Sequence, residues 1–146
     1  MSNEIKRVTF SLPLPPSVNS QYARAGIRRV LSKEAKNFKK SVKARIHRLR
    51  VDDVITDAFI AELQAGWVGI FMDMYFKSPM KRDLDGGLKI TQDSVLDSLG
   101  INDNRVVDIH LVKRIDPLNP RVEIELEAIP DWEFDKRYYV LDNEED

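Results

Sequence analysis

The sequence contains no cysteine, which excludes disulfide bonds and any metal site built on thiolates. No apolar run approaches the ~18 residues that a membrane-spanning helix needs. The first residues do not form the charged and then apolar start of a signal peptide, and neither His47 nor His110 lies in a pattern typical of a metal ligand. We therefore expect a cytoplasmic protein with no membrane partner.

Acidic residues are scarce in the first 50 positions, which hold 13 lysines and arginines against Glu4 and Glu34. The remaining positions hold 10 cations against 22 acids, so the net charge of −1 hides two parts of opposite sign. Such asymmetry indicates a basic face for a polyanion beside an acidic region. The length of 146 residues fits one domain. We place that domain at 1–130 and an acidic tail at 131–146.

Hydrophobic patterns predict three elements in the first half: a strand at 5–12, a helix from the N-cap residue Ser32 to Arg50, and a weaker helix within 52–64. Residues 19–29 are typical of a polar, basic surface loop, with a DNA-contacting loop as the alternative. The first helix bears seven cations on its outer face, for which phosphate binding and simple solvation are both open. They are Lys36, Lys39, Lys40, Lys43, Arg45, Arg48 and Arg50.

In the second half, the stretch 66–77 is nearly continuous in apolar residues and predicts a central strand covered on both faces. A helical pattern follows at 87–99 and ends at Gly100. Two further strands are expected at 106–112 and 122–126. Together these elements predict a single α+β domain, with a mixed β-sheet of about four to five strands and two to three helices packed on it.

Two carboxylates, Asp83 and Asp85, lie two residues apart just before the helix predicted at 87–99. Carboxylates are hard oxygen ligands of the type that Mg²⁺ and Mn²⁺ prefer, although two acids at this spacing are more often solvated turn residues or a helix cap. The context favours a ligand site. Gly86 and Gly87 allow close approach of the backbone, the helix N-terminus favours carboxylates and phosphates alike, and Lys89 lies one turn beyond Asp85.

Several motifs occur in a fixed order along the chain. They are Leu12-Pro13-Leu14-Pro15-Pro16-Ser17-Val18-Asn19, Val30-Leu31-Ser32-Lys33-Glu34, Arg82-Asp83-Leu84-Asp85, Lys89, Leu96-Asp97-Ser98-Leu99, Asn102-Asp103, Arg105-Val106-Val107-Asp108 and Val112-Lys113. Over about 5–128 the chain thereby resembles the RusA family of Holliday junction resolvases. The resemblance implies a homodimeric, Mg²⁺-dependent endonuclease, in which Mn²⁺ can substitute, that cuts four-way DNA junctions in recombination and repair.

In that family three aspartates and a lysine carry the chemistry. Position by position they match the metal ligands Asp83, Asp85 and Asp103, together with the catalytic Lys89. The chain departs from the family pattern at Gly86, where an asparagine is usual, and at Asn102, where an aspartate is usual.

The interpretation also assigns residues to the DNA surface. These are Arg24, Arg28, Arg29, Lys36, Lys39, Lys40, Lys43 and Arg82. Two other functions fit the same residues. One is a non-catalytic module that binds branched DNA and whose acids only cap a helix, and the other is a broader flap or branched-DNA nuclease with the same metal site.

Overall fold

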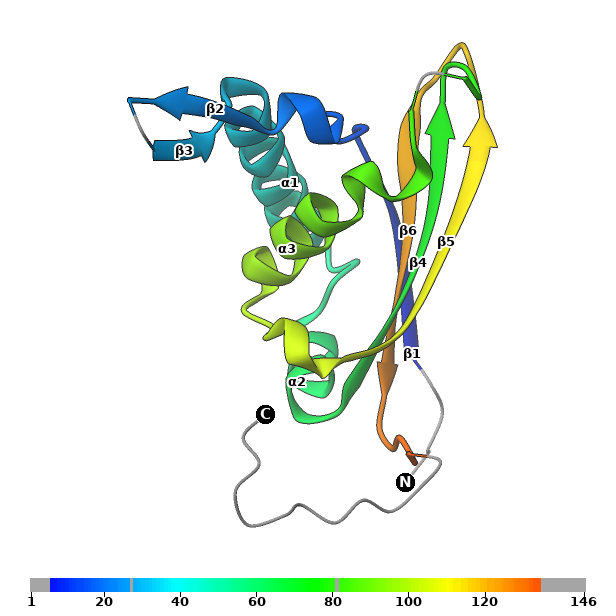
Figure 1. Cartoon of the computed structure of the whole chain (residues 1–146). Helices are drawn as coiled ribbons and strands as arrows, with labels where there is room; N and C mark the ends of the chain where they lie inside the picture. Colours follow the sequence, from blue (N-terminus) through cyan, green and yellow to red (C-terminus); the bar gives the residue numbers. More distant parts are fainter. Residues whose placement is uncertain (1–5, 27, 81, 135–146) are drawn as a thin grey trace.

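The computed structural model describes residues 6–26, 28–80 and 82–134. Its elements are β1 (Lys6–Leu12), η1 (Val18–Ser20), β2 (Tyr22–Ala25), β3 (Arg28–Leu31), α1 (Lys33–Val51), α2 (Asp57–Ala65), β4 (Trp67–Phe76), η2 (Leu84–Gly87), α3 (Leu88–Leu99), η3 (Asp103–Arg105), β5 (Val106–Ile115) and β6 (Arg121–Ile129). Four strands form a mixed sheet in the order β1-β6-β4-β5, and β2 and β3 form a separate pair. The three α-helices lie on one side of the mixed sheet (Figure 1). This is the single α+β domain that the sequence predicts.

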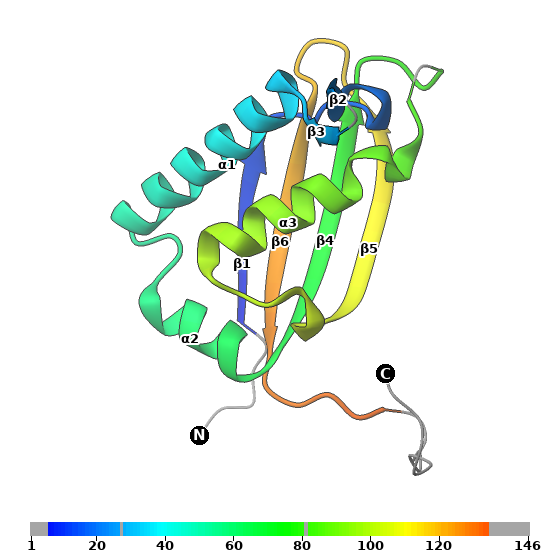
Figure 2. The ribbon, with the colours of Figure 1, turned by 60° about the vertical axis from the view of Figure 1, so that its left-hand side comes forward.

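Strand β4 lies at the centre of the sheet, antiparallel to β6 and parallel to β5. Two neighbouring parallel strands need a crossover connection, which here runs through η2, α3 and η3. Figure 2 shows α3 crossing in front of the sheet, with α1 beside it. The segment 83–87, which carries two of the candidate metal ligands, therefore lies where the chain leaves the carboxyl end of β4 and enters α3.

The core fills the space between the helices and one face of the sheet. Alternate residues of β4 are buried there, from Val68 to Phe76, and they meet the buried side of α1. Ser32 accepts a hydrogen bond from the backbone N–H of Ala35, so its predicted role as the N-cap of α1 is confirmed. The second helix, predicted as weak, is confirmed as α2. No helix in the described ranges is long and apolar enough to cross a membrane.

The prediction that β4 is covered on both faces is wrong, because the three helices lie on one side (Figure 1). On the other face, Phe71 stacks on the ring of His110 with centroids 4.4 Å apart. Tyr75 lies under the guanidinium of Arg121, 4.0 Å from the ring centroid. These aromatic rings pack on neighbouring strands of the same sheet. Their apolar character therefore does not indicate a second layer.

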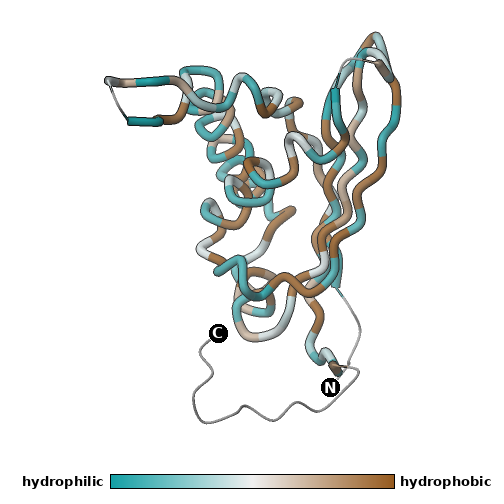
Figure 3. The backbone as a smooth tube through the Cα atoms, viewed as in Figure 1, coloured by the Kyte–Doolittle hydropathy of each residue, from teal (hydrophilic) through white to brown (hydrophobic). Residues whose placement is uncertain are grey.

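The loop expected at 19–29 is instead mostly a β-hairpin, β2–β3, that projects from the body (Figure 1). Its strands are only four residues long and lack a clear alternation of large apolar residues, so the hydrophobic pattern does not reveal them, and Figure 3 shows hydrophilic and hydrophobic residues mixed along this part of the chain. Gly26 permits the reversal because its φ of +68° is a left-handed conformation. Residue 27 lies outside the described ranges. We call β2–β3 the arginine hairpin, after Arg24, Arg28 and Arg29.

The beginning of the expected acidic tail returns to the sheet. The ring of Phe134 lies edge-on to Trp67, with centroids 5.9 Å apart and an interplanar angle of 87°. Tyr138 and Tyr139, also considered as docking groups, lie outside the described residues.

We propose that the domain folds without residues 131–146. Ending the chain after Pro130 is expected to lower the free energy of unfolding by about 1 kcal/mol or less, because the Phe134 ring is largely exposed and contributes one edge contact to Trp67. Urea denaturation of the full and shortened chains measures this difference. Loss of the cooperative transition in the shortened chain would show that the tail belongs to the domain.

Candidate active site

A pocket of about 430 Å³ opens beside the N-terminal end of α3. Its wall includes the carboxylates Asp83 and Asp85 and the cations Lys39 and Lys89. We call it the acid pocket. Lys89 on α3 and Lys39 on α1 thus border the same pocket as the two acids.

The acids do not cap the helix. Asp83 occupies the position before η2 but makes no side-chain cap hydrogen bond there, and the residue before α3 is Gly87. Both carboxylates belong to exposed residues. Among the hydrogen bonds and salt bridges of the described residues, none engages the side chain of Asp83, Asp85 or Asp103. The helix-cap interpretation is therefore wrong.

The acid-bearing segment rests on the proline-rich stretch after β1. The buried side-chain amide of Gln21 donates to the backbone oxygen of Gly86 at 2.7 Å and to that of Pro16 at 3.0 Å. A guanidinium nitrogen of Arg82 donates to the backbone oxygen of Pro15 at 2.7 Å. Sequence reasoning did not single out Gln21, since a lone glutamine in a polar stretch carries no signal. These bonds set the place of the two acids.

Arg82, expected at the DNA surface, is half-buried in the structure. Its guanidinium lies 5.2 Å from the ring centroid of Phe76, and burial lowers its pKa from the ordinary arginine value. Its backbone oxygen accepts a hydrogen bond from the Lys113 ammonium at 2.9 Å. With Asp83 it also lines a smaller hollow of about 150 Å³. One guanidinium nitrogen of Arg82 thus helps to position the segment that carries the two acids. The same side chain borders the smaller hollow beside Asp83. Lys81 lies outside the described residues.

Lys89 pairs with Asp93 one turn further along α3, at 3.2 Å. This is the ion pair that the i,i+4 spacing predicts. The pKa of Lys89 is raised, first by the hydrogen bond and charge of Asp93, against a lowering by desolvation, and then by the charges of Asp103 and Tyr22. The side chain therefore stays a cation at neutral pH, and it lies within electrostatic reach of Asp103.

Asp103 is exposed and is the first residue of η3, which follows α3 in the chain. The residue before it, Asn102, caps this turn by accepting a hydrogen bond from the N–H of Asn104 at 3.0 Å. Asparagine at that position, a departure from the family pattern, thus has a local structural role. Asp103 does not line the acid pocket.

The donor chemistry of these residues fits a hard divalent cation, because Asp83 and Asp85 present exposed carboxylate oxygens to one pocket and have no competing partner in the described part. In residues 6–26, 28–80 and 82–134, however, no three acidic or histidine side chains lie close enough together to hold one ion. The structure therefore brings together two of the three expected ligands.

The seven cations predicted for the outer face of α1 divide into two groups. Lys36, Lys39, Lys40 and Lys43 follow the spacing i, i+3, i+4, i+7 and so share one side of the helix. We call them the lysine stripe. Two of them face α3: Lys39 lines the acid pocket, and with Lys43 it lines a further hollow of about 240 Å³ beside Ser94 and Ser98.

The remaining helix cations have other neighbours. Arg45 donates to the backbone oxygen of Ser11 on β1 at 3.4 Å. Arg48 pairs with Asp52 at 3.1 Å, and Arg50 pairs with Asp57 at 3.0 Å. Of these seven helix cations, only Lys39 of the stripe lines the acid pocket. The seven cations predicted as one basic face are therefore not equivalent.

The two glycines after Asp85 offer a test of the packing. A Cβ on Gly87 would overlap the ring of Pro15, whereas a Cβ on Gly86 would meet its nearest neighbour, the backbone nitrogen of Val18, at an ordinary 3.9 Å. Gly87→Ala is expected to lower the free energy of unfolding by about 1–3 kcal/mol through overpacking, and to slow the DNA cleavage that the sequence motifs lead us to expect, because it displaces the acids.

Gly86→Ala is the matched control and should behave like the parent. Urea denaturation and a cleavage assay check both variants. Equal behaviour of the two would contradict the contact between Gly87 and Pro15.

A carboxylate pocket flanked by a lysine stripe and an arginine hairpin is typical of proteins that act on a polyanion, and carboxylates that hold a metal ion suit chemistry on a phosphodiester. Residues 13–127 match the family model described as "Endodeoxyribonuclease RusA". The chain therefore belongs to the RusA endodeoxyribonuclease family, as the sequence motifs indicate. A search among curated proteins finds no match.

Family membership implies nuclease activity on Holliday junctions, which are branched DNA. The family is also generally dependent on a divalent metal.

Proposed function

We propose that this protein is a Mg²⁺-dependent, structure-selective endonuclease that resolves four-way DNA junctions by paired phosphodiester cuts, with Mn²⁺ able to replace Mg²⁺. The observation that carries this proposal is the acid pocket: two exposed carboxylates without protein partners among the described residues, beside two cations, in a member of this family.

Asp83, Asp85 and Asp103 would hold the metal. Bound there, a divalent ion supplies an activated water and neutralises charge that develops on the phosphate. Lys89 is a cation at neutral pH, as any exposed lysine is, and Asp93 raises its pKa further. Its ammonium carries movable donors, and we assign it to the non-bridging oxygens of the phosphate or to the leaving group.

The DNA backbone would lie along the lysine stripe and the arginine hairpin. Lys39 supports this path because it lines the acid pocket from α1. Arg24, Arg28 and Arg29 extend the positive surface beyond the pocket, where they line a hollow of about 560 Å³. Arg82 would add a phosphate contact at the edge of the acids. Most of the affinity then comes from phosphate contacts and depends steeply on salt.

A homodimer fits the substrate, because a four-way junction has near two-fold symmetry and an isologous dimer presents two equivalent sites to opposing strands. Sedimentation of the protein alone and bound to one junction measures the number of chains. One chain per junction would contradict paired cutting by a dimer.

The test of function is incubation with a synthetic four-way junction and Mg²⁺, beside duplex and flap DNA of matching sequence. We expect paired nicks at symmetric positions of the junction and much slower cutting of the duplex. Equal cutting of the flap would make the protein a broader branched-DNA nuclease. Binding without any cutting in Mg²⁺ or Mn²⁺ would leave a non-catalytic module.

A further inference from the structure

We propose that Tyr22 is a base-stacking platform that receives an unpaired nucleobase of the DNA strand beside the phosphate to be cut. This inference rests on the proposed function. It adds a positioning residue where two pockets meet. The inference does not require Tyr22 to contact the proposed metal ligands.

The register of the arginine hairpin determines which side chains share a face. Tyr22 pairs with Leu31, and Arg24 pairs with Arg29. Because side chains alternate along a strand, these four lie on the same face of the hairpin. Tyr22 and Leu31 line the acid pocket. Arg24 and Arg29 therefore continue the wall of that pocket outward, one residue pair further along the hairpin.

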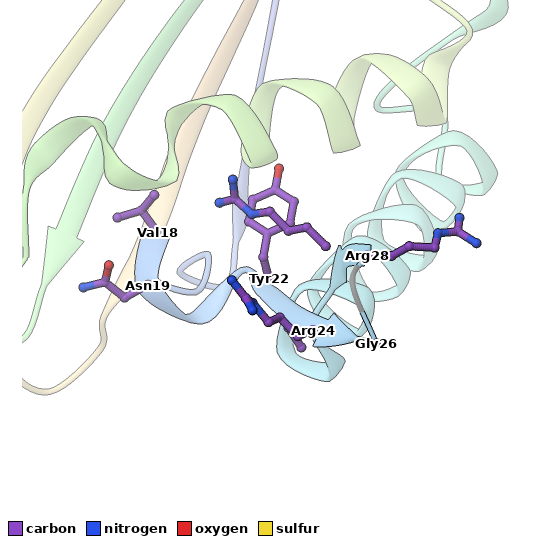
Figure 4. Close-up of a pocket in the computed structure, with 8 residues that line it drawn as sticks. Val18, Asn19, Tyr22, Arg24, Gly26 and Arg28 are labelled. Carbon is purple, nitrogen blue, oxygen red and sulfur yellow. The ribbon is translucent and has the colours of Figure 1, made fainter.

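Two hollows meet at Tyr22. The acid pocket and the larger hollow under the arginine hairpin, of about 560 Å³, share Val18 and Tyr22 in their walls. Figure 4 shows the Tyr22 side chain projecting towards α3, while Arg28 extends away from it. A DNA strand that follows the two hollows from the hairpin to the acids would pass this ring.

The chemistry of Tyr22 matches an unpaired base. Its residue is 44% exposed, and the guanidinium carbon of Arg29 lies 4.0 Å from the ring centroid. An aromatic ring paired with an arginine is a recurrent stacking surface for single-stranded nucleic acid, where bases are not already stacked in a duplex. Tyr22 and Lys89 both line the acid pocket, so the ring lies beside the cation assigned to the phosphate.

The competing explanation is that the pair of Arg29 and Tyr22 only stabilises the hairpin, as cross-strand pairs do. The chain offers a matched control for that explanation. Tyr75 lies under Arg121 with the same 4.0 Å separation, on the sheet face without helices. Tyr75→Leu thus removes an equivalent aromatic–guanidinium pair away from both hollows.

The experiment compares Tyr22→Leu, Tyr22→Phe and Tyr75→Leu in metal-free buffer. The probes are a four-way junction with 2-aminopurine at the crossover and a perfect duplex of the same length. The parent is expected to change the fluorescence of the junction probe on binding. Tyr22→Leu should lose that change and bind the junction about 5- to 100-fold more weakly, with duplex affinity unchanged. Tyr22→Phe, which keeps a ring, and Tyr75→Leu should match the parent.

An equal loss of affinity for the junction and the duplex in Tyr22→Leu would overturn the inference and favour a structural role for the ring. Parental affinity and fluorescence of Tyr22→Leu on both probes would also overturn the inference. Thermal unfolding of each variant shows whether the fold is intact. The proposed function fails separately, if the parent itself neither binds nor cuts the junction. A parent that binds and cuts, with a Tyr22→Leu variant that does both equally well, removes only the stacking platform.

Discussion

Asparagine in place of Asp83, Asp85 or Asp103 is expected to slow junction cleavage by several orders of magnitude while binding survives. Each change keeps the size of the side chain and removes one negative charge from a proposed ligand, so water activation and neutralisation of the phosphate are lost together. In metal-free buffer the variants should bind the junction as tightly as the parent or more tightly, because one repulsion from the DNA phosphates is gone. Cleavage in Mg²⁺ and binding without metal are the two measurements.

The structure supplies a control on the same helix. Asp97 is an exposed acid of α3 that lines the neighbouring hollow with Lys39 but not the acid pocket. Asp97→Asn should therefore cut at close to the parental rate. A near-parental rate for Asp83→Asn or Asp85→Asn would remove that residue from the metal site. The same result for all three, Asp103→Asn included, would contradict the nuclease mechanism although the chain belongs to the family.

Asp103→Asn tests a different point, because Asp103 does not form a three-residue metal-binding group with the other two acids in the described residues. A loss equal to that of Asp83→Asn would show that Asp103 joins the site when metal and DNA bind. A much smaller loss would mean that two carboxylates suffice.

Removal of two lysines from the stripe is expected to weaken junction binding on the order of 50-fold at 0.1 M salt. Each phosphate contact contributes about 0.9 to the slope of log affinity against log salt, so Lys36→Ala with Lys40→Ala should reduce the magnitude of the slope by about 1.8. Binding titrations over a range of salt concentrations measure both quantities. Neither lysine lines the acid pocket, so the rate of cutting at saturating protein should stay near that of the parent.

The matched control removes the same charge from the same helix. Arg45→Ala with Arg48→Ala takes away two cations that contact Ser11 and Asp52 outside the stripe. This pair should change the salt slope little. Equal slopes for the two double variants would show that the whole helix acts by its net charge and that the stripe is not a specific contact surface.

Much of the architecture was predictable because its signals are local. The spacing of buried residues on α1 and the cap at Ser32 determine that helix, and Gly100 ends α3 in the left-handed conformation, at φ +68°. The α+β class and the family follow from patterns and motifs that are contiguous in the chain. The spacing of Asp85 and Lys89 around a helix start likewise allows the two side chains to face the same way, and in the structure they line one pocket with Asp83.

Other features depend on contacts between distant segments, which no local pattern encodes. The single covered face of β4 was missed because aromatic rings that pack on neighbouring strands have the same hydropathy as rings buried under a helix. The arginine hairpin was missed because cross-strand backbone bonds, and not apolar alternation, hold it together.

The sequence by itself determined the class of fold, the family and the candidate acids, because residue chemistry and spacing are sufficient for each. Only the tertiary structure decided how those acids are held. Gln21 and Pro15 lie more than 60 positions before the segment that they support, and their bonds to it exist only once β1 and β4 share a sheet. The division of the α1 cations has the same cause, since the neighbours of a helix face are set by packing against α3 and β1.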